Sequence, residues 1–325
     1  MPILLAPSAD LARGVLAATP VSLTVEAEYG SYVAEGARYT AAHHQPAGSR
    51  FAGNHVVKGG RRSPCCDENI PSLEEGEVVL VSHIDLDTFG GCLRAMPEFA
   101  DLFPTSTPPT SSSSVAEIPA WGDLGAFWSL AEFIDVRGQH KLGEAEMPPR
   151  TLRQIYAYWA WSKSPAGGPR LPRDQVTDVT DLVRSAGEVL RRIFADDEAL
   201  LAAGDAYKAE EDALNARTFS RRAGNVIARV ATRSREFCNH LYVDPDGVPA
   251  RAVACLNAET GSVTISLADP VPGVSCRSIV QRLWGSEAGG HDGIAGSPRE
   301  RRMTDEEFQE AVVALSLAVM DDREI

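Results

Sequence analysis

A run of four consecutive apolar residues, Val78–Val81, constrains the fold of this 325-residue chain more than any other short segment. A strand with one face in water alternates polar and apolar side chains. A continuous apolar run is instead typical of a strand that is buried on both faces of a parallel sheet. Residues 151–235 carry apolar side chains at helical spacing over much of their length. The sequence therefore predicts an α/β protein with a parallel sheet in its N-terminal part.

The length and the change of pattern along the chain predict two domains. After residue 235 the pattern changes to two strand-like segments, 250–259 and 261–269, followed by a helix and a Gly-rich loop. Thr304 and Glu307 form a capping box that opens a final amphipathic helix. We expect an α/β domain over 1–195, a helical connector over 196–235 and a smaller α+β domain over 236–325.

Composition and charge exclude several classes of protein. Hydrophobic residues make up 44% of the chain and charged residues 23%, which is ordinary for a globular protein. The formal net charge of -14 disfavours a protein that coats nucleic acid without regard to sequence. No apolar run is long enough to span a bilayer, and Asp10 and Arg13 interrupt the first apolar segment. The six cysteines are scattered without a C-x-x-C pair, so we expect reduced thiols and a cytoplasmic location.

Three side chains that commonly bind metals follow the apolar run at alternate positions: His83, Asp85 and Asp87. The carboxyl ends of parallel strands open into the ligand crevice of an α/β sheet, so these side chains are expected at that crevice. Carboxylate oxygens with an imidazole suit manganese or magnesium, and zinc or iron if more nitrogen ligands join. The alternative is a polar turn in which an aspartate caps the next helix. Three ligand-type residues within five positions favour the metal site.

Two further segments supply candidate ligands. His43 and His44 follow a strand-like run, and a polar strand end is an equally good interpretation of that pair. Asp135 follows the apolar segment FWSLAEFI, which is either a helix or a strand. It is a candidate ligand from a second strand, or else an ordinary carboxylate at the end of a helix.

A Gly-rich segment over 288–296, with Gly289, Gly290 and His291 at its centre, is the candidate substrate site. Consecutive glycines expose backbone N–H groups that bind anions, and His291 can hydrogen-bond a phosphate or a carboxylate. Arg299, a few residues further on, adds a permanent positive charge with bidentate geometry. The alternative is a surface loop without a ligand.

Taken together, these segments resemble the DHH phosphoesterase superfamily. The first motif of that family is a buried strand, a His and D-x-D-x-x-G, which Val78–Val81, His83, Asp85, Asp87 and Gly90 match. Its smaller C-terminal domain carries a strand pair, a helix and G-G-G-H-x-x-A-A-G, which 288–296 matches as AGGHDGIAG. The resemblance implies that His83, Asp85 and Asp87 bind manganese and that Asp135 is the aspartate of the second motif. It also implies that Gly289, Gly290 and His291 hold the phosphate or base end of the substrate.

The D-H-H triplet that names the family does not follow Asp135. The only adjacent histidine pair, His43-His44, lies before the first motif and is preceded by Ala42. Either this pair fills the same space through a different strand order, or the chain has a different metal centre and a different reaction.

The resemblance implies a hydrolase that cleaves a phosphoester in a small nucleotide or a short oligonucleotide. A divalent metal, with Mn²⁺ preferred over Zn²⁺, Fe²⁺ or Mg²⁺, would generate the hydroxide nucleophile, and Asp87 and His44 are the candidate catalytic residues. The alternatives are a metal-dependent hydrolase of a non-phosphate substrate and a non-catalytic protein that binds nucleotides or RNA. Short RNA and a second copy of the chain are further candidate partners. A candidate basic face for RNA consists of Arg217, Arg221, Arg222, Arg229, Arg233 and Arg235.

Overall fold

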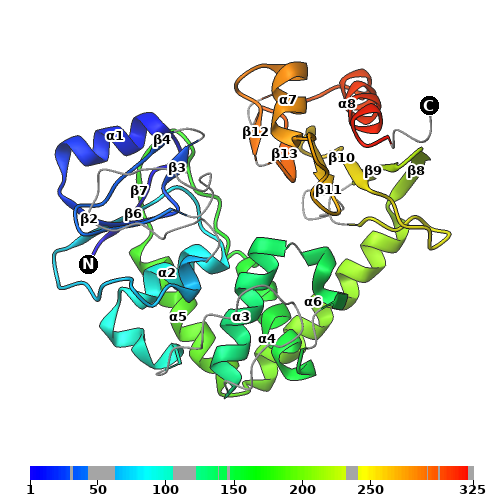
Figure 1. Ribbon diagram of the computed structural model, residues 1–325. Coiled ribbons are helices and arrows are strands. Elements are labelled where there is room, and N and C mark those ends of the chain that lie inside the picture. Colours follow the sequence, from blue (N-terminus) through cyan, green and yellow to red (C-terminus); the bar gives the residue numbers. More distant parts are fainter. Residues whose placement is uncertain are drawn as a thin grey trace. The chain divides into compact units, whose positions relative to one another are not determined.

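The structure, a computed structural model, divides the chain into two compact units, Met1–Lys208 and Ala209–Ile325. Each unit has a sheet of its own (Figure 1). The residues that the structure describes are 1–29, 32–42, 63–104, 122–137, 139–144, 147–231, 241–290, 292–298 and 301–320.

The first unit is built on a five-stranded sheet in the order β5-β2-β6-β1-β7. Its central strand, β6, pairs in parallel with β1 and β2, and β5 pairs in parallel with β2. Strand β7 is antiparallel to β1. The parallel sheet predicted from the apolar run is therefore confirmed. The strands are β1 (Ile3–Leu5), β2 (Val21–Val25), β5 (Tyr39–Ala41), β6 (Val78–Val81) and β7 (Thr177–Asp178).

Strand β6 is apolar throughout because its two faces pack against different cores. Val79 and Val81 join the core formed with helices α2 to α5, whereas Val78 and Leu80 join a smaller core that includes Ala12 and other residues of α1. Figure 1 shows α1 on one side of the sheet and α2 on the other. The helices of this unit are α1 (Ala9–Ala18), α2 (Leu86–Arg94), α3 (Gly122–Arg137), α4 (Pro149–Ser162) and α5 (Thr180–Phe194), and α6 (Glu198–Arg217) begins in it.

Short elements complete the first unit. A two-stranded hairpin lies between β2 and β5, and three 3-10 helices connect the longer elements. They are β3 (Glu28–Tyr29), β4 (Tyr32–Val33), η1 (Pro64–Cys66), η2 (Pro97–Leu102) and η3 (Gln139–Glu144).

The second unit contains a six-stranded sheet in the order β12-β13-β11-β10-β9-β8. The β10–β11 hairpin turns at Gly261, whose φ of 72° lies in the region that favours glycine. The capping box of Thr304 and Glu307 is present at the start of α8. The elements are β8 (Phe219–Ala223), β9 (Val226–Ala231), β10 (Ala252–Asn257), β11 (Ser262–Leu267), α7 (Cys276–Trp284), β12 (Gly289–Gly290), β13 (Ile294–Gly296) and α8 (Asp305–Ala318).

The connector expected over 196–235 is helical only as far as Arg217, where α6 ends. Residues 219–231 form strands β8 and β9 instead, and β9 pairs in parallel with β10 over six residue pairs. The segment Val226–Ala231 is rich in β-branched residues and nearly all buried, which suits a central strand better than a helix. None of the described helices is long and apolar enough to cross a membrane.

Gly90 and Gly91 allow helix α2 to pack closely against η1 and β2. A Cβ at Gly90 would overlap the Cβ of Cys65 and lie 2.8 Å from the Trp128 ring. A Cβ at Gly91 would lie 2.8 Å from Pro64 and from Val25. These glycines are therefore a requirement of the core.

We predict that Gly90→Ala lowers the free energy of unfolding by about 1–3 kcal/mol, because the added methyl group overpacks a dense core. Gly14→Ala, in an exposed position of α1 with nothing within 4 Å, is the matched control. This control should raise stability by roughly 0.5–1 kcal/mol, since alanine is the better helix former. Urea unfolding followed by tryptophan fluorescence measures both changes. Equal stability of the two variants would contradict the packing role.

Candidate metal centre

The candidate site lies at the carboxyl ends of β2 and β6, which are neighbouring parallel strands. Val25 and Val81 are register partners at the last pair of this ladder. Glu26 follows one strand, and Ser82 and His83 follow the other, so segments 56 residues apart in sequence meet here. The Ser82 hydroxyl donates a hydrogen bond to the backbone carbonyl of Glu26. This is the edge of the sheet where α/β proteins bind their ligands.

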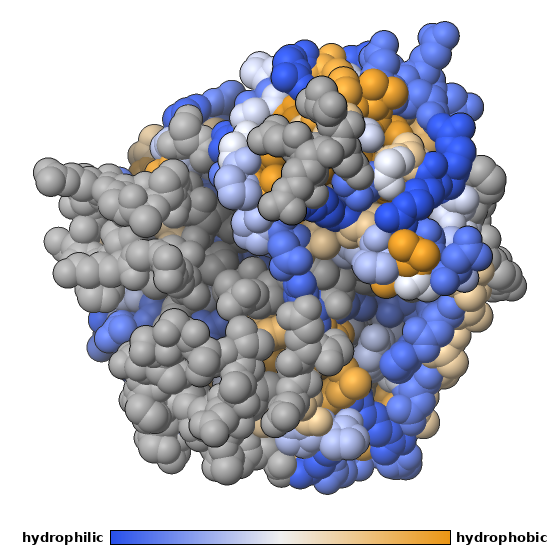
Figure 2. All heavy atoms as spheres, turned by 45° about the vertical axis from the view of Figure 1, so that its right-hand side comes forward, coloured by the Kyte–Doolittle hydropathy of each residue, from blue (hydrophilic) through white to orange (hydrophobic). Residues whose placement is uncertain are grey.

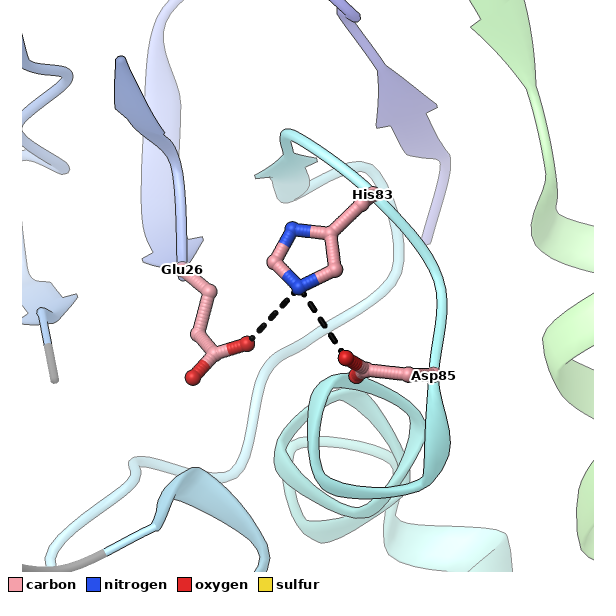
Figure 3. A group of neighbouring side chains, drawn as sticks. All are labelled: Glu26, His83 and Asp85. Carbon is pink, nitrogen blue, oxygen red and sulfur yellow. Dashed lines mark ion pairs between the residues drawn. The ribbon is translucent and has the colours of Figure 1, made fainter. Parts of the chain in front are cut away.

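His83 lies between two carboxylates (Figure 3). Its Nε2 atom is 3.3 Å from Glu26 Oε2 and 3.1 Å from Asp85 Oδ2. Its other ring nitrogen, Nδ1, is 2.8 Å from the Ser82 hydroxyl oxygen. Because that hydroxyl already donates its hydrogen to the Glu26 carbonyl, its oxygen accepts a hydrogen bond from Nδ1–H. In the neutral imidazole this arrangement leaves the lone pair on Nε2, directed toward the carboxylates.

Asp85 makes two kinds of contact, and the helix-capping role that the sequence offered as the alternative is confirmed. It is the N-cap of α2, where its Oδ1 accepts a hydrogen bond of 3.2 Å from the backbone N–H of Thr88. Its Oδ2 faces His83. The cap therefore fixes the position of the carboxylate beside the imidazole.

A second group of oxygen atoms forms on the other side of Glu26. Atoms of Glu26, Asp87 and Asp135 lie within 4.8 Å of one another, as do those of Glu26, His83 and Asp85. Asp87 is in the first turn of α2 and only 6% exposed. Its buried Oδ2 has no hydrogen-bond partner among the described residues. Asp135 lies within α3, so the idea that it comes from a second strand is wrong.

Glu26 is the residue that sequence reasoning missed. It is 1% exposed, and its φ of 48° is unusual for a residue other than glycine. Its N–H donates to the Ala41 carbonyl at 2.9 Å, and its Oε2 accepts from the Thr88 hydroxyl at 2.9 Å. The available signal was a carboxylate directly after the strand-like run VSLTV. This signal has meaning only once β2 is known to pair in parallel with β6.

The pKa values of the acidic groups in the site are shifted in opposite directions. Burial raises the pKa of Asp87 well above its ordinary value, and the charges of Asp85, Glu26 and Asp135 add to this rise. Burial also opposes the ionised forms of Glu26 and Asp85, but the adjacent His83 outweighs it, so that both pKa values are lowered. Burial disfavours the charged form of His83, yet Asp85 and Glu26 hold its pKa well above 6.5. Without a metal ion, the site therefore favours the protonated forms of His83 and Asp87 more than water does.

The remaining predicted site residues are His43, His44, Gly289, Gly290, His291 and Arg299. His43, His44, His291 and Arg299 lie outside the residues that the structure describes. Gly289 and Gly290 belong to the second unit, where they form β12 and pair with β13 instead of forming an open loop. A Cβ at Gly290 would lie 2.6 Å from the Cα of Ala295.

Two arginines of the predicted basic face for RNA have partners within the second unit. Arg229 is only 4% exposed, and its guanidinium donates to the carbonyls of Leu241 and Val243. Arg222 forms an ion pair of 3.0 Å with Asp244. These two arginines therefore make contacts within the second unit.

A groove between α7 and α8 is also a poor place for an anionic substrate. It is lined by Asp305, Glu306 and Glu310, together with apolar residues that include the exposed Val313 and Leu317. Apolar surface is visible among hydrophilic residues in the upper part of Figure 2, where the second unit comes forward. Three carboxylates against the single Arg282 would repel a phosphate.

Searches against models of known protein families and against curated proteins find no match to this chain. The resemblance to the DHH phosphoesterases, which rests on two short motifs, therefore remains a prediction.

We predict that the metal-free protein loses stability as the pH rises above 6.5, the ordinary pKa of histidine. The folded protein raises the pKa values of His83 and Asp87, so it holds their protons more tightly than the unfolded chain. Each contribution is complete below the ordinary value, 6.5 for His83 and 3.8 for Asp87, and is lost as the pH passes the raised pKa. Glu26 and Asp85 have lowered pKa values, so their contributions are lost only at acidic pH.

Urea unfolding in EDTA at several pH values tests this expectation. Four of the five tryptophans are in the first unit, so their fluorescence reports mainly on it. His83→Gln should show a shallower loss of stability, and Mn²⁺ should reverse the trend for the unchanged protein because metal ions compete with protons for these ligands. A loss of the same steepness in His83→Gln would show that other groups cause it.

Proposed function

We propose that this chain is a divalent-metal-dependent phosphoesterase that acts on a small nucleotide or a short oligonucleotide. The observation that carries the proposal is the convergence of four carboxylates and one imidazole at the carboxyl edge of a parallel sheet. One of these groups, Asp87, has a buried oxygen without a hydrogen-bond partner among the described residues. Burying such an atom is costly unless a ligand pairs with it.

The donor set fits a hard divalent cation. Carboxylate oxygens are the preferred ligands of Mg²⁺ and Mn²⁺, and a single imidazole favours Mn²⁺. His83, Asp85, Asp87 and Asp135 would hold the metal, and His43 or His44, which follow β5 in the sequence, would complete the set. When bound, the metal would lower the pKa of a water molecule and neutralise charge on the phosphoryl oxygens.

Ser82 prepares His83 for this role. Its hydrogen bond from Nδ1–H selects the tautomer in which Nε2 carries a lone pair, and it fixes the orientation of the ring. In metal-binding histidines the ring nitrogen that does not bind the metal usually donates a hydrogen bond in this way, which makes the other nitrogen a stronger ligand. Asp85 is held equally firmly because it caps α2. The residues that would bind the metal are thus positioned before any metal arrives.

The choice of a phosphoester substrate rests on the DHH resemblance. Gly289, Gly290, His291 and Arg299 would orient the phosphate, and Asp87 and His44 would take part in catalysis. The proposal also places the protein in the cytoplasm, and every cysteine in the described part of the chain is a free thiol. A second copy of the chain and short RNA remain proposed partners.

We predict that Asp87→Asn loses bound Mn²⁺ and lowers phosphodiesterase activity by more than about a hundredfold. Mutation of a group that only hydrogen-bonds to a metal ligand lowers metal affinity or activity about 10–100-fold. Mutation of a direct ligand should therefore have a larger effect. Elemental analysis after dialysis measures the metal, and hydrolysis of bis(p-nitrophenyl) phosphate and of 5′-phosphorylated dinucleotides measures the activity. Asp174→Asn, an exposed residue outside the cluster, is the matched control.

Full metal content and full activity in Asp87→Asn would overturn the proposal. Metal that binds to the unchanged protein without hydrolysis of any phosphoester would instead favour a metal-dependent hydrolase with a non-phosphate substrate. Absence of bound metal, even after reconstitution with Mn²⁺, would favour a binding protein.

A further inference from the structure

We propose that the second unit binds a basic amphipathic helix of a partner protein in the groove between α7 and α8. These two helices lie side by side in the second unit (Figure 1). The inference goes beyond the proposed function and does not depend on the metal centre, because every residue that carries it belongs to the second unit.

The C-terminal half of α8, with the two residues that follow it, is apolar around its whole circumference. From Ala311 to Met320 the sequence contains a single polar residue, Ser316. Its hydroxyl donates a hydrogen bond of 3.3 Å to the carbonyl of Ala223, so it serves a contact within the unit. A helix that is apolar on all sides is normally buried on all sides. Only one side of α8 is buried in the core of the second unit, through Phe308, Ala311, Val312 and Leu315.

The other side of α8 is exposed. Leu317 is 67% exposed and Val313, one helical turn earlier, is 57% exposed. Within the described part of the chain, Leu317 is the most exposed of the large apolar side chains, and Met320 is also exposed. Single apolar side chains are common on protein surfaces, whereas apolar side chains that are gathered along a groove mark an interaction site.

The exposed side of α8 forms one wall of an open groove, and α7 forms the other. The groove has a volume of about 1040 Å³, and its apolar lining includes Leu283 of α7 together with Val313 and Leu317 of α8. A groove of this kind accepts the apolar face of a helix, whose side chains recur at positions i, i+3, i+4 and i+7. A small molecule would need a more enclosed pocket, since such ligands are usually buried over about 70–90% of their surface.

Charge identifies the partner helix as basic. Three carboxylates line the groove near the start of α8: Asp305, Glu306 and Glu310. None of them forms an ion pair with another residue that the structure describes. The positive groups beside them are Arg282 in the lining and Arg221, which already donates a hydrogen bond of 2.6 Å to Gln309. Lysine or arginine side chains of a partner would pair with the carboxylates, and the net charge of -14 would steer a basic partner toward the chain.

A second copy of the chain is a poorer occupant of this groove. In a two-fold symmetric pair the same surface faces itself. Parallel α8 helices would bring the acidic ends together, and antiparallel helices would place the carboxylates of one copy against the apolar side chains of the other. Both arrangements take charges out of water without a positive partner, which is unfavourable. The same carboxylates disfavour an anionic lipid surface.

The test is the binding of a fluorescein-labelled peptide of leucine and lysine, about 18 residues or five helical turns long, with its leucines on one face of the helix. Fluorescence anisotropy with the full chain measures the affinity. We expect binding that weakens as salt is added. A peptide of the same composition with its leucines spread around the helix, and a peptide with glutamate in place of lysine, should both bind at least about tenfold more weakly.

Two variants separate the apolar and the charged contributions. Leu317→Gln leaves the core intact because the side chain is mostly exposed, and it should weaken binding by at least about tenfold. Glu310→Gln should weaken binding about two- to fivefold and make it less dependent on salt. Val248→Gln and Asp246→Asn make the matching changes at exposed positions of the same unit outside the groove, and both should bind like the unchanged protein.

Equal binding by Leu317→Gln, or no binding by the unchanged protein, would overturn the proposal. Analytical ultracentrifugation and flotation with vesicles of phosphatidylcholine and phosphatidylserine test the other occupants. A dimer that Leu317→Gln dissociates would assign the groove to a second copy, and flotation that Leu317→Gln abolishes would assign it to a membrane surface. Either result would replace the partner helix proposed here.

Discussion

The parallel pairing of β2 with β6 is the constraint on which the candidate site depends. It places Glu26 beside Ser82 and His83, and these residues have no other reason to meet. The pairing is fixed by burial, because β6 contributes alternate side chains to two different cores and a shift by one residue would exchange them. The apolar cores thus determine which polar groups come together at the end of the sheet.

Helix α2 connects the stability of the first unit to the geometry of the site. Its N-cap is Asp85, its first turn carries Asp87, and its second turn begins with two glycines that pack against η1 and β2. The same helix therefore supplies ligands at its start and close packing one turn later. A residue larger than glycine at Gly90 would displace the helix and with it both carboxylates. We expect metal affinity and core packing to change together in this protein.

The features that could be predicted from sequence are those that depend on neighbouring residues. The buried strand, the alternating His83, Asp85 and Asp87, and the capping box of α8 are local patterns, and the structure contains all of them. Glu26 could not be found in this way, since its role follows from a pairing between distant strands. The packing role of Gly90 could not be predicted for the same reason, because nothing in the sequence shows that Cys65 lies against it. The connector predicted as helical over 196–235 includes strands β8 and β9, because the pairing of these strands into a sheet is also a long-range property.

The buried carboxylates destabilise the fold and favour metal binding for the same reason, which is the repulsion between negative charges that are shielded from water. In the metal-free protein protons relieve the repulsion, since the pKa values of both Asp87 and His83 are raised. A divalent cation would replace those protons, and its two positive charges would compensate the carboxylates more strongly than a single proton does. Because Ser82, Asp85 and the backbone of Glu26 are already fixed by hydrogen bonds, little ordering remains to be done when the ion binds. Folding has already buried and oriented these groups, so metal binding does not have to supply that free energy again. The affinity for the metal would be higher than for the same carboxylates in a flexible arrangement.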